Sequence, residues 1–171
     1  ELNLSFNKLT ILEPDTFKIL TKLTSLSLSN NQIESIDVGL FQTCCNLTEL
    51  YFENNKLTIL DAKIFKQLTQ LTQLRLSNNQ IETYKGQAFV GCSNLKYLFL
   101  DNNKLTILTA QTFKQLNKLT GLWLHNNKIE SIDGETFDEC PNLSEIFLGY
   151  NKITILAADT FKKLTQLTKL G

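Results

Sequence analysis

Residues 71–79 read LTQLRLSNN and residues 23–31 read LTSLSLSNN, so the pattern L-x-x-L-x-L-x-x-N is present in both stretches. The pattern recurs every 24 residues, and no insertion interrupts it. Its first leucine marks the start of each repeat and stands at Leu23, Leu47, Leu71, Leu95, Leu119, Leu143 and Leu167. Phenylalanine follows the same period, at Phe17, Phe41, Phe65, Phe89, Phe113, Phe137 and Phe161. A constant period of this length predicts a solenoid in which each repeat forms one turn.

The spacing of the leucines predicts which side chains are buried. In L-x-L, both leucines point to one side of a short strand and the residue between them points to the other. Parallel strands lie about 4.8 Å apart, so equivalent residues of successive repeats form ladders. Leucines and phenylalanines then fill one continuous core. We expect the asparagine that ends each motif to satisfy buried loop backbone groups with its amide.

The extended motif, L-x-x-L-x-L-x-x-N-x-[LI]-x-x-[LI] with Phe at the nineteenth position, is the leucine-rich repeat signature. It resembles the typical-type repeat of animal extracellular recognition proteins. Residues 65–81, FKQLTQLTQLRLSNNQI, resemble the variable modules of variable lymphocyte receptors and, more distantly, Toll-like receptor ectodomains. The resemblance implies an α/β solenoid, an arc with a parallel β-sheet on its concave face and mostly loops and short helical turns on its convex face. It also implies an extracellular ligand-binding role.

We expect residues 1–171 to form a single leucine-rich repeat domain. The cysteine-rich end caps of these families are absent from the segment, and solenoids need their ends covered. Caps outside the segment, or a partner over the ends, would both meet that need.

Composition and charge exclude several function classes. Lys and Arg together number 17, as do Asp and Glu, so the net charge is zero. A balanced chain lacks the positive field that nucleic-acid binding uses, which disfavours nucleic acid as the main partner. No apolar run approaches the roughly 20 residues of a membrane span, so direct membrane insertion is not expected. The sequence holds no phosphate-binding loop and no clustered metal ligands, and we expect no cofactor.

One histidine invites a catalytic interpretation. His125 is the only histidine, and Asp101 occupies the same position one repeat earlier. The flanking repeats carry Ser77 and Gly149 there. Ser77 would lie two strands from His125, roughly 10 Å away, which is too far for a hydrogen-bonded triad. We therefore interpret His125 and Asp101 as a surface polar pair and the chain as non-enzymatic.

The cysteines and glycosylation sequons leave the compartment open. Cys44, Cys92 and Cys140 recur two repeats apart, about 10 Å, beyond the roughly 7 Å that a disulfide spans. They are expected to be buried free thiols, whereas Cys45 is either an exposed thiol or a strained bridge to its neighbour. Sequons begin at Asn3, Asn46 and Asn142, the number that chance predicts, so they are compatible with secretion without arguing for it.

Residues that the repeat does not explain gather on the predicted strands. The position between the paired leucines reads Asn3, Ser27, Tyr51, Arg75, Phe99, Trp123 and Phe147, and Arg75 and Trp123 are the only residues of their types. Aromatic residues and arginine are enriched at binding hot spots. The candidate ligand-binding residues are Glu49, Tyr51, Glu53, Arg75, Tyr97, Phe99, Asp101, Trp123, His125, Glu145, Phe147 and Tyr150. Alternatively, these aromatic residues serve only to pack on one another.

These features predict a non-enzymatic recognition module that binds a protein or glycan determinant on the concave strand face. The resemblance favours an immune-type, extracellular role, and the monomer is the favoured oligomeric state. Two alternatives stay open. One is a structural or adhesive protein that self-associates or scaffolds other proteins. The other is a cytosolic scaffold, which buried free thiols would suit.

Overall fold

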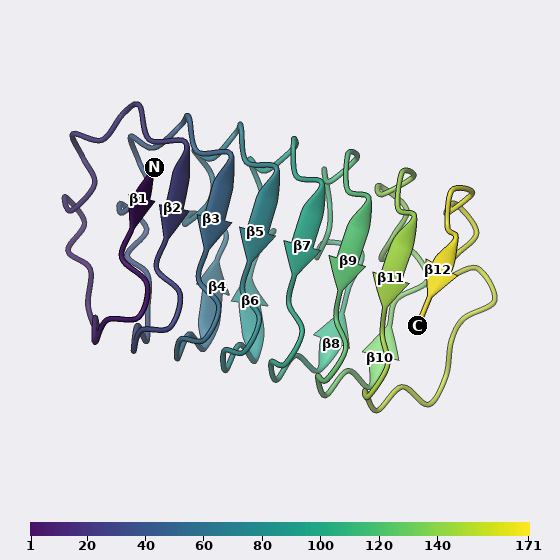
Figure 1. The fold of residues 1–171 in the computed structure, drawn as a ribbon. Helices are drawn as coiled ribbons and strands as arrows, with labels where there is room; N and C mark the ends of the chain where they lie inside the picture. Colours follow the sequence, from purple (N-terminus) through teal and green to yellow (C-terminus); the bar gives the residue numbers. More distant parts are fainter.

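A parallel sheet of eight short strands forms one side of the molecule in the computed structural model, which describes all residues 1–171 (Figure 1). Each strand pairs with the strand 24 residues further along, as Leu26 does with Leu50. The solenoid thus makes about seven turns, one for each repeat. In sheet order the strands are β1 (Leu2–Asn3), β2 (Ser25–Ser27), β3 (Glu49–Tyr51), β5 (Gln73–Arg75), β7 (Tyr97–Phe99), β9 (Gly121–Trp123), β11 (Glu145–Phe147) and β12 (Lys169–Leu170).

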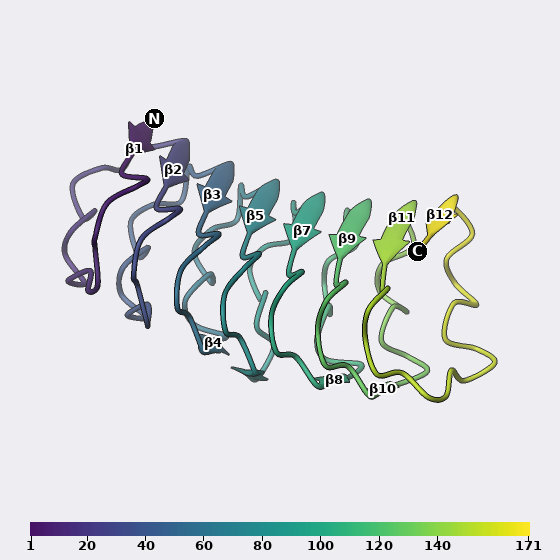
Figure 2. The ribbon, with the colours of Figure 1, turned by 60° about the horizontal axis from the view of Figure 1, so that its bottom comes forward.

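The segments that return to the next strand run along the opposite side (Figure 2). Four of them contain very short strands, which pair in parallel as β4 with β6 and β8 with β10. Their bounds are β4 (Ile59–Asp61), β6 (Thr83–Lys85), β8 (Ile107–Leu108) and β10 (Ser131–Ile132). Turns and irregular backbone make up the rest.

The structure contains no helix, so the predicted α/β class and its short convex helical turns are wrong; the fold is a β-solenoid. In the first returning segment, Thr16 N donates to Glu13 O and Lys18 N donates to Asp15 O. Such bonds span three residues and close separate turns, whereas an α-helix needs successive bonds that span four. The segment must bury Phe17 and Leu23 and then enter the next strand, and a chain of tight turns achieves this within few residues.

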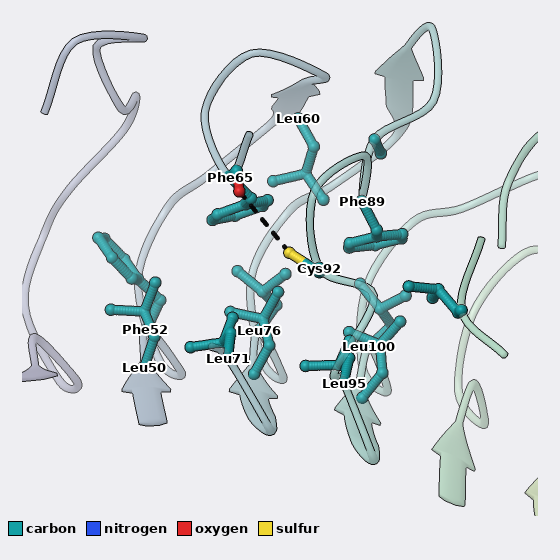
Figure 3. Packing of buried hydrophobic residues seen from close by; sticks show 14 of the residues in the cluster. Leu50, Phe52, Leu60, Phe65, Leu71, Leu76, Phe89, Cys92, Leu95 and Leu100 are labelled. Atoms are coloured by element: carbon teal, nitrogen blue, oxygen red, sulfur yellow. Dashed lines mark hydrogen bonds between the residues drawn. The ribbon is translucent and has the colours of Figure 1, made fainter. Parts of the chain in front are cut away.

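A phenylalanine spine runs through the core at the position predicted from the period. Neighbouring rings stack one repeat apart: the centroids of Phe89 and Phe113 are 6.3 Å apart and those of Phe113 and Phe137 are 6.0 Å apart. Figure 3 shows leucines on and beside the strands, such as Leu50 and Leu76, in the same core cluster as the rings of Phe65 and Phe89. All buried apolar residues belong to one continuous cluster. No repeat buries its apolar face alone, so stability is shared between neighbours.

The recurring asparagine ties each repeat to the preceding one, and its amide satisfies buried backbone groups as expected. The Asn55 amide Nδ2 donates to Leu28 O and Phe52 O, at 3.0 and 3.1 Å. Its Oδ1 accepts from Ile33 N at 3.0 Å. These backbone groups are buried, so each would cost free energy if it lost its partner. The same bonds recur at Asn31, Asn79, Asn103, Asn127 and Asn151.

Three of the four cysteines are buried and all four are free. Burial raises the pKa of the Cys92 and Cys140 thiols to about 12, so they stay protonated at neutral pH. The Cys92 thiol donates to Phe65 O (Figure 3), at 3.8 Å. Cys45 is an exposed thiol and forms no bridge to Cys44. The recurring cysteines act as small apolar residues of the core.

Candidate binding surface on the strand face

Alternation along each strand separates the core from a second, outward surface. In β5, the side chain of Leu74 is fully buried, whereas Gln73 and Arg75 on either side are partly exposed. The same alternation holds in β2, β3 and β11. We call the surface formed by these outward side chains the strand face. The residue between the paired leucines lies on this face.

Five large side chains follow one another across the strand face, and we call them the wall ladder. Backbone register places Tyr51 beside Arg75, Arg75 beside Phe99, Phe99 beside Trp123, and Trp123 beside Phe147. All five are partly buried and partly exposed. They come from five adjacent strands, β3, β5, β7, β9 and β11. One period of 24 residues therefore produces both the buried spine and this outward ladder.

The side chains of the wall ladder stack on one another. The ring centroids of Phe99 and Trp123 are 4.1 Å apart with planes 11° apart, and those of Trp123 and Phe147 are 5.8 Å apart. The Arg75 guanidinium carbon lies 5.5 Å from the Tyr51 ring centroid and 4.8 Å from that of Phe99, close enough for cation–π attraction to both rings. The ladder is thus a preordered row of planar groups. Mutual stacking also covers part of each ring.

Gly121 makes room for the centre of this row. A Cβ atom at Gly121 would lie 2.7 Å from the outer end of the Trp123 indole and 3.1 Å from the Tyr97 ring. The indole therefore lies across the backbone of its own strand, and Tyr97 beside it is 43% exposed. Sequence reasoning missed Gly121. The available signal was a glycine at a position that reads Ser25, Glu49, Gln73 and Tyr97 in earlier repeats.

Acidic residues surround Tyr51 at the other end of the ladder. The Tyr51 hydroxyl donates to Glu49 Oε2 at 2.8 Å. Burial, followed by this hydrogen bond and the charge of Glu49, raises the pKa of Tyr51 to about 12. One carboxylate oxygen of Glu53 is buried without a hydrogen-bond partner. Glu49 and Glu53 give this part of the strand face an acidic character, and Arg75 is the adjacent basic residue.

Arg75 is held in place from two directions. Its guanidinium lies between the rings of Tyr51 and Phe99. With the Gln73 amide oriented to satisfy the network, Gln73 Oε1 accepts from Arg75 Nε at 2.7 Å and from Nη2 at 3.1 Å. A cation fixed in this way presents its remaining N–H groups in a defined direction.

Ser77, Asp101 and His125 form a line just beyond the ends of β5, β7 and β9, with the aspartate in the middle. Ser77 Oγ donates to Asp101 Oδ1 at 2.6 Å, and Asn102 Nδ2 donates to Oδ2 at 2.7 Å. His125 Nε2 lies 3.7 Å from Asp101 Oδ2, and its Nδ1 is buried without a partner. Asp101 is only 9% exposed, so the predicted surface pair is wrong for this residue. The serine contacts the aspartate and not the histidine, which does not correspond to a nucleophile–base arrangement.

A profile described as leucine rich repeat matches residues 1–33, 21–81, 69–129 and 118–171, which together span the chain. The chain belongs to the leucine-rich repeat family. Leucine-rich repeats typically mediate protein–protein interactions and generally serve as non-enzymatic binding scaffolds. Among curated proteins, no sequence matches this one.

Among solved structures, this leucine-rich repeat chain is similar to a chain of the Drosophila Toll–Spatzle complex, described as a molecular hub in development and innate immunity. The two are 25% identical in sequence and superpose with a TM-score of 0.67. The match covers 86% of this chain and 24% of the other, so the present chain spans about a quarter of its length.

Two exposed aromatic residues of this leucine-rich repeat chain adopt a backbone conformation that suits asparagine. Phe6 and Tyr150 both have φ of 57°, and their side chains are 82% and 85% exposed. The five intervening repeats place asparagine there, with φ between 54° and 58°, at Asn30, Asn54, Asn78, Asn102 and Asn126. Asparagine tolerates the left-handed region, whereas a bulky aromatic residue is strained in it. The sequence predicted Tyr150 as a candidate contact without indicating this strain.

The remaining candidate, Glu145, is paired at the C-terminal end of the strand face. Lys169 Nζ donates to Glu145 Oε1 at 2.6 Å. A Cβ atom added at Gly149, between Phe147 and Tyr150, would have no other atom within 4 Å. Gly149 is the next position in the row that carries Asp101 and His125, and the space beside it is therefore unfilled. All twelve candidate residues lie on adjacent strands of this face or, for Glu53, Asp101, His125 and Tyr150, just beyond the strand ends.

Neither a metal site nor a membrane-spanning helix is found in the structure. No three or more His, Cys, Asp or Glu side chains are placed to hold a metal ion. None of the segments forms a helix of the length and hydropathy needed to span a bilayer. An apolar recess of about 440 Å³ lies at the C-terminal end of the solenoid between Leu148, Ile155, Phe161 and Leu170. It is the end of the core, and none of its lining residues belongs to the wall ladder.

Proposed function

We propose that the strand face recognises an extracellular ligand, a protein or glycan determinant, in an immune-type role. The wall ladder is the observation that carries this proposal. A soluble chain gains little from placing its only tryptophan and its only arginine on one partly exposed row unless a partner covers them. The family supports a partner that is a protein. The 25% identity to a chain of the Toll–Spatzle complex supports an extracellular recognition role.

The stacking within the ladder helps binding as well as folding. Phe99, Trp123 and Phe147 hold one another in place, so little side-chain freedom is left to lose when a ligand covers them. Preordered side chains lower the entropic cost of association. The hypothesis that the rings only pack on one another accounts for their orientation but not for the exposed face that they leave. We therefore favour a surface that is both packed and presented.

The charges along the strand face suggest the polarity of the ligand. Glu145 is paired with Lys169, and Asp101 is hydrogen-bonded to Ser77 and Asn102. The acidic groups with spare acceptor capacity are Glu49 and Glu53, on either side of Tyr51. A matching ligand has a basic group near Tyr51 and an apolar or planar group near Trp123.

Matched substitutions on the two sides of the solenoid test this assignment. The wild-type chain is screened against arrayed extracellular proteins and glycans, and each hit is measured again with Trp123→Ala and Phe99→Ala. We expect each substitution to weaken binding by about 2 kcal/mol or more, roughly 30-fold. The control variant reverses the charge of Lys66 and Lys114, which follow spine phenylalanines on the outer side.

The control is expected to bind as the wild type does. If the Trp123 variant binds as tightly as the wild type, recognition lies elsewhere. Loss of binding in the lysine variant would lead to the same conclusion. Light scattering over a range of concentrations measures the oligomeric state in the same samples. A dimer that forms through the ladder and breaks in the Trp123 variant would instead support the self-associating, adhesive function.

A further inference from the structure

Two asparagines occupy the same position of their repeats at the edge where strands begin. Asn46 lies three residues before β3 and Asn142 lies three residues before β11, and both are exposed. Each begins a glycosylation sequon, Asn46-Leu47-Thr48 and Asn142-Leu143-Ser144. The strand starts form the upper edge of the sheet in Figure 1. The two sites therefore share one edge of the solenoid.

The local hydrogen bonds are compatible with a sugar on each of these amide nitrogens. Asn46 Nδ2 donates to Thr21 O at 2.8 Å, and Asn142 Nδ2 donates to Asn117 O at 2.6 Å. An asparagine amide has two N–H groups. Attachment of a sugar replaces one of them, and the other can keep the bond to the preceding repeat. Because both side chains are exposed, the attached sugar has room in solvent.

We propose that Asn46 and Asn142 carry N-linked glycans, both on the strand-start edge, which leave the wall ladder uncovered. This inference rests on the extracellular location proposed above. In the reaction, Nδ2 forms a bond to the anomeric carbon of an activated, phosphate-linked oligosaccharide. The bond from that carbon to the phosphate oxygen breaks, the phosphate leaves with the electron pair, and Nδ2 releases one proton.

The third sequon, at Asn3, lies on the strand face and not on its edge. Asn3 lies in β1 and pairs with Ser27, in the row that continues through Tyr51 into the wall ladder. A glycan there would extend from the strand face itself. At the edge, by contrast, glycans would shield one flank and restrict a ligand to the strand face and the opposite flank.

A repeat between the two sites supplies a matched control. Asn94 occupies the same position, and its Nδ2 donates to Thr69 O at 2.7 Å, but Lys96 stands where the sequon needs Ser or Thr. Lys96→Thr completes a sequon there. Other repeats have Thr48, Thr72 and Thr120 at this position, each donating to a backbone carbonyl of the preceding repeat, so the variant is expected to fold.

The experiment expresses the full chain behind a signal peptide in animal cells and measures its mass before and after enzymatic deglycosylation. Intracellular and secreted material are both analysed, because the glycan is transferred during translocation and poor export would not hide it. We expect peptide mapping to find glycans at Asn46 and Asn142. Asn46→Gln and Asn142→Gln should each remove one glycan, and Lys96→Thr should add one. An unmodified Asn46 or Asn142 overturns the proposal.

The placement on the edge is tested separately, without a ligand. Trp123 is the only tryptophan, so acrylamide quenching of its fluorescence reports on access to the wall ladder alone. We expect the quenching constant to be the same before and after deglycosylation. A marked increase after deglycosylation would show that the glycans cover the ladder. Neither measurement depends on ligand binding, so failure here and failure of the proposed recognition function are distinguishable.

Discussion

The phenylalanine spine and the wall ladder are two rows of stacked rings built by the same period. In the spine, rings stack 5.9 to 6.4 Å apart from Phe17 to Phe41 and again from Phe65 to Phe161, and Phe41 meets Phe52 edge-on between these two runs. The rings from Phe17 to Phe137 are almost completely buried. In the ladder, Phe99 and Trp123 lie 4.1 Å apart, and every member keeps part of its surface in solvent. Stacking is therefore common to both rows, and solvent access distinguishes them.

This difference in solvent access predicts different consequences for substitutions in the two rows. A spine ring is surrounded by leucines of its own and adjacent repeats, so its removal leaves a cavity that the rigid turns cannot close. A ladder ring lies over polar backbone and its neighbours, and water can replace it. Substitutions in the first row should affect folding, and those in the second should affect binding.

The largest difference is expected between Phe113→Ala and Phe99→Ala. Phe113 is fully buried, between Phe89 and Phe137, and its truncation should lower the free energy of unfolding by about 3–5 kcal/mol. Phe99 loses mainly its stacking on Trp123 and its contact with Arg75, a loss of about 1 kcal/mol. Urea unfolding followed by circular dichroism measures both. Similar losses in the two variants would contradict the separation of roles.

A smaller effect is expected when a side chain is added at Gly121, beneath the Trp123 indole. Gly121→Ser adds a Cβ that meets the indole at 2.7 Å, so the ring must lift away from Phe99. We expect a loss of about 1 kcal/mol in stability and stronger acrylamide quenching of Trp123. Gly149→Ser is the control, because a Cβ there meets no atom within 4 Å. Equal quenching in both variants would show that Gly121 does not position the indole.

Tyr150→Asn should change stability in the opposite direction. The variant restores the residue that five repeats use at φ of 54° to 58°, and relief of strain should raise stability by about 1 kcal/mol. For a chain of this size, the midpoint of thermal unfolding would rise by roughly 2–4 °C. Phe6→Asn is the matched variant at the other end. If Tyr150 contacts ligand, Tyr150→Asn should also bind more weakly, whereas Phe6→Asn should not. A lower midpoint of thermal unfolding in both variants would refute backbone strain at these two residues.

The last difference concerns pH and is confined to values above 10. The folded state raises the pKa of Tyr51 from 10 to about 12, so the folded chain holds this proton more tightly than the unfolded chain does. The associated stability is fully present below pH 10 and is lost as the pH rises towards 12. Tyr51→Phe should therefore flatten the decline over that window, measured by urea unfolding at several pH values. An unchanged slope would show that Tyr51 ionises alike in both states.

The regular parts of the molecule followed from the sequence because the period places equivalent residues one strand apart. The buried leucines, the asparagine bonds and the free cysteines were predicted correctly. The convex helical turns were not, because a short stretch that mixes turn-forming and apolar residues is compatible with either a helical turn or successive β-turns. Only the packing of Phe17 and its equivalents in the folded chain selects the second.

Within the candidate site, the period alone placed Tyr51, Arg75, Phe99, Trp123 and Phe147 in one row, because a residue between two buried leucines must face outward. The tertiary structure decided how these side chains meet. The indole lies over Gly121, the guanidinium lies between two rings, and Asp101 is buried between Ser77 and His125. Rotamers and hydrogen bonds of this kind depend on several neighbouring strands at once, and no repeat contains that information by itself.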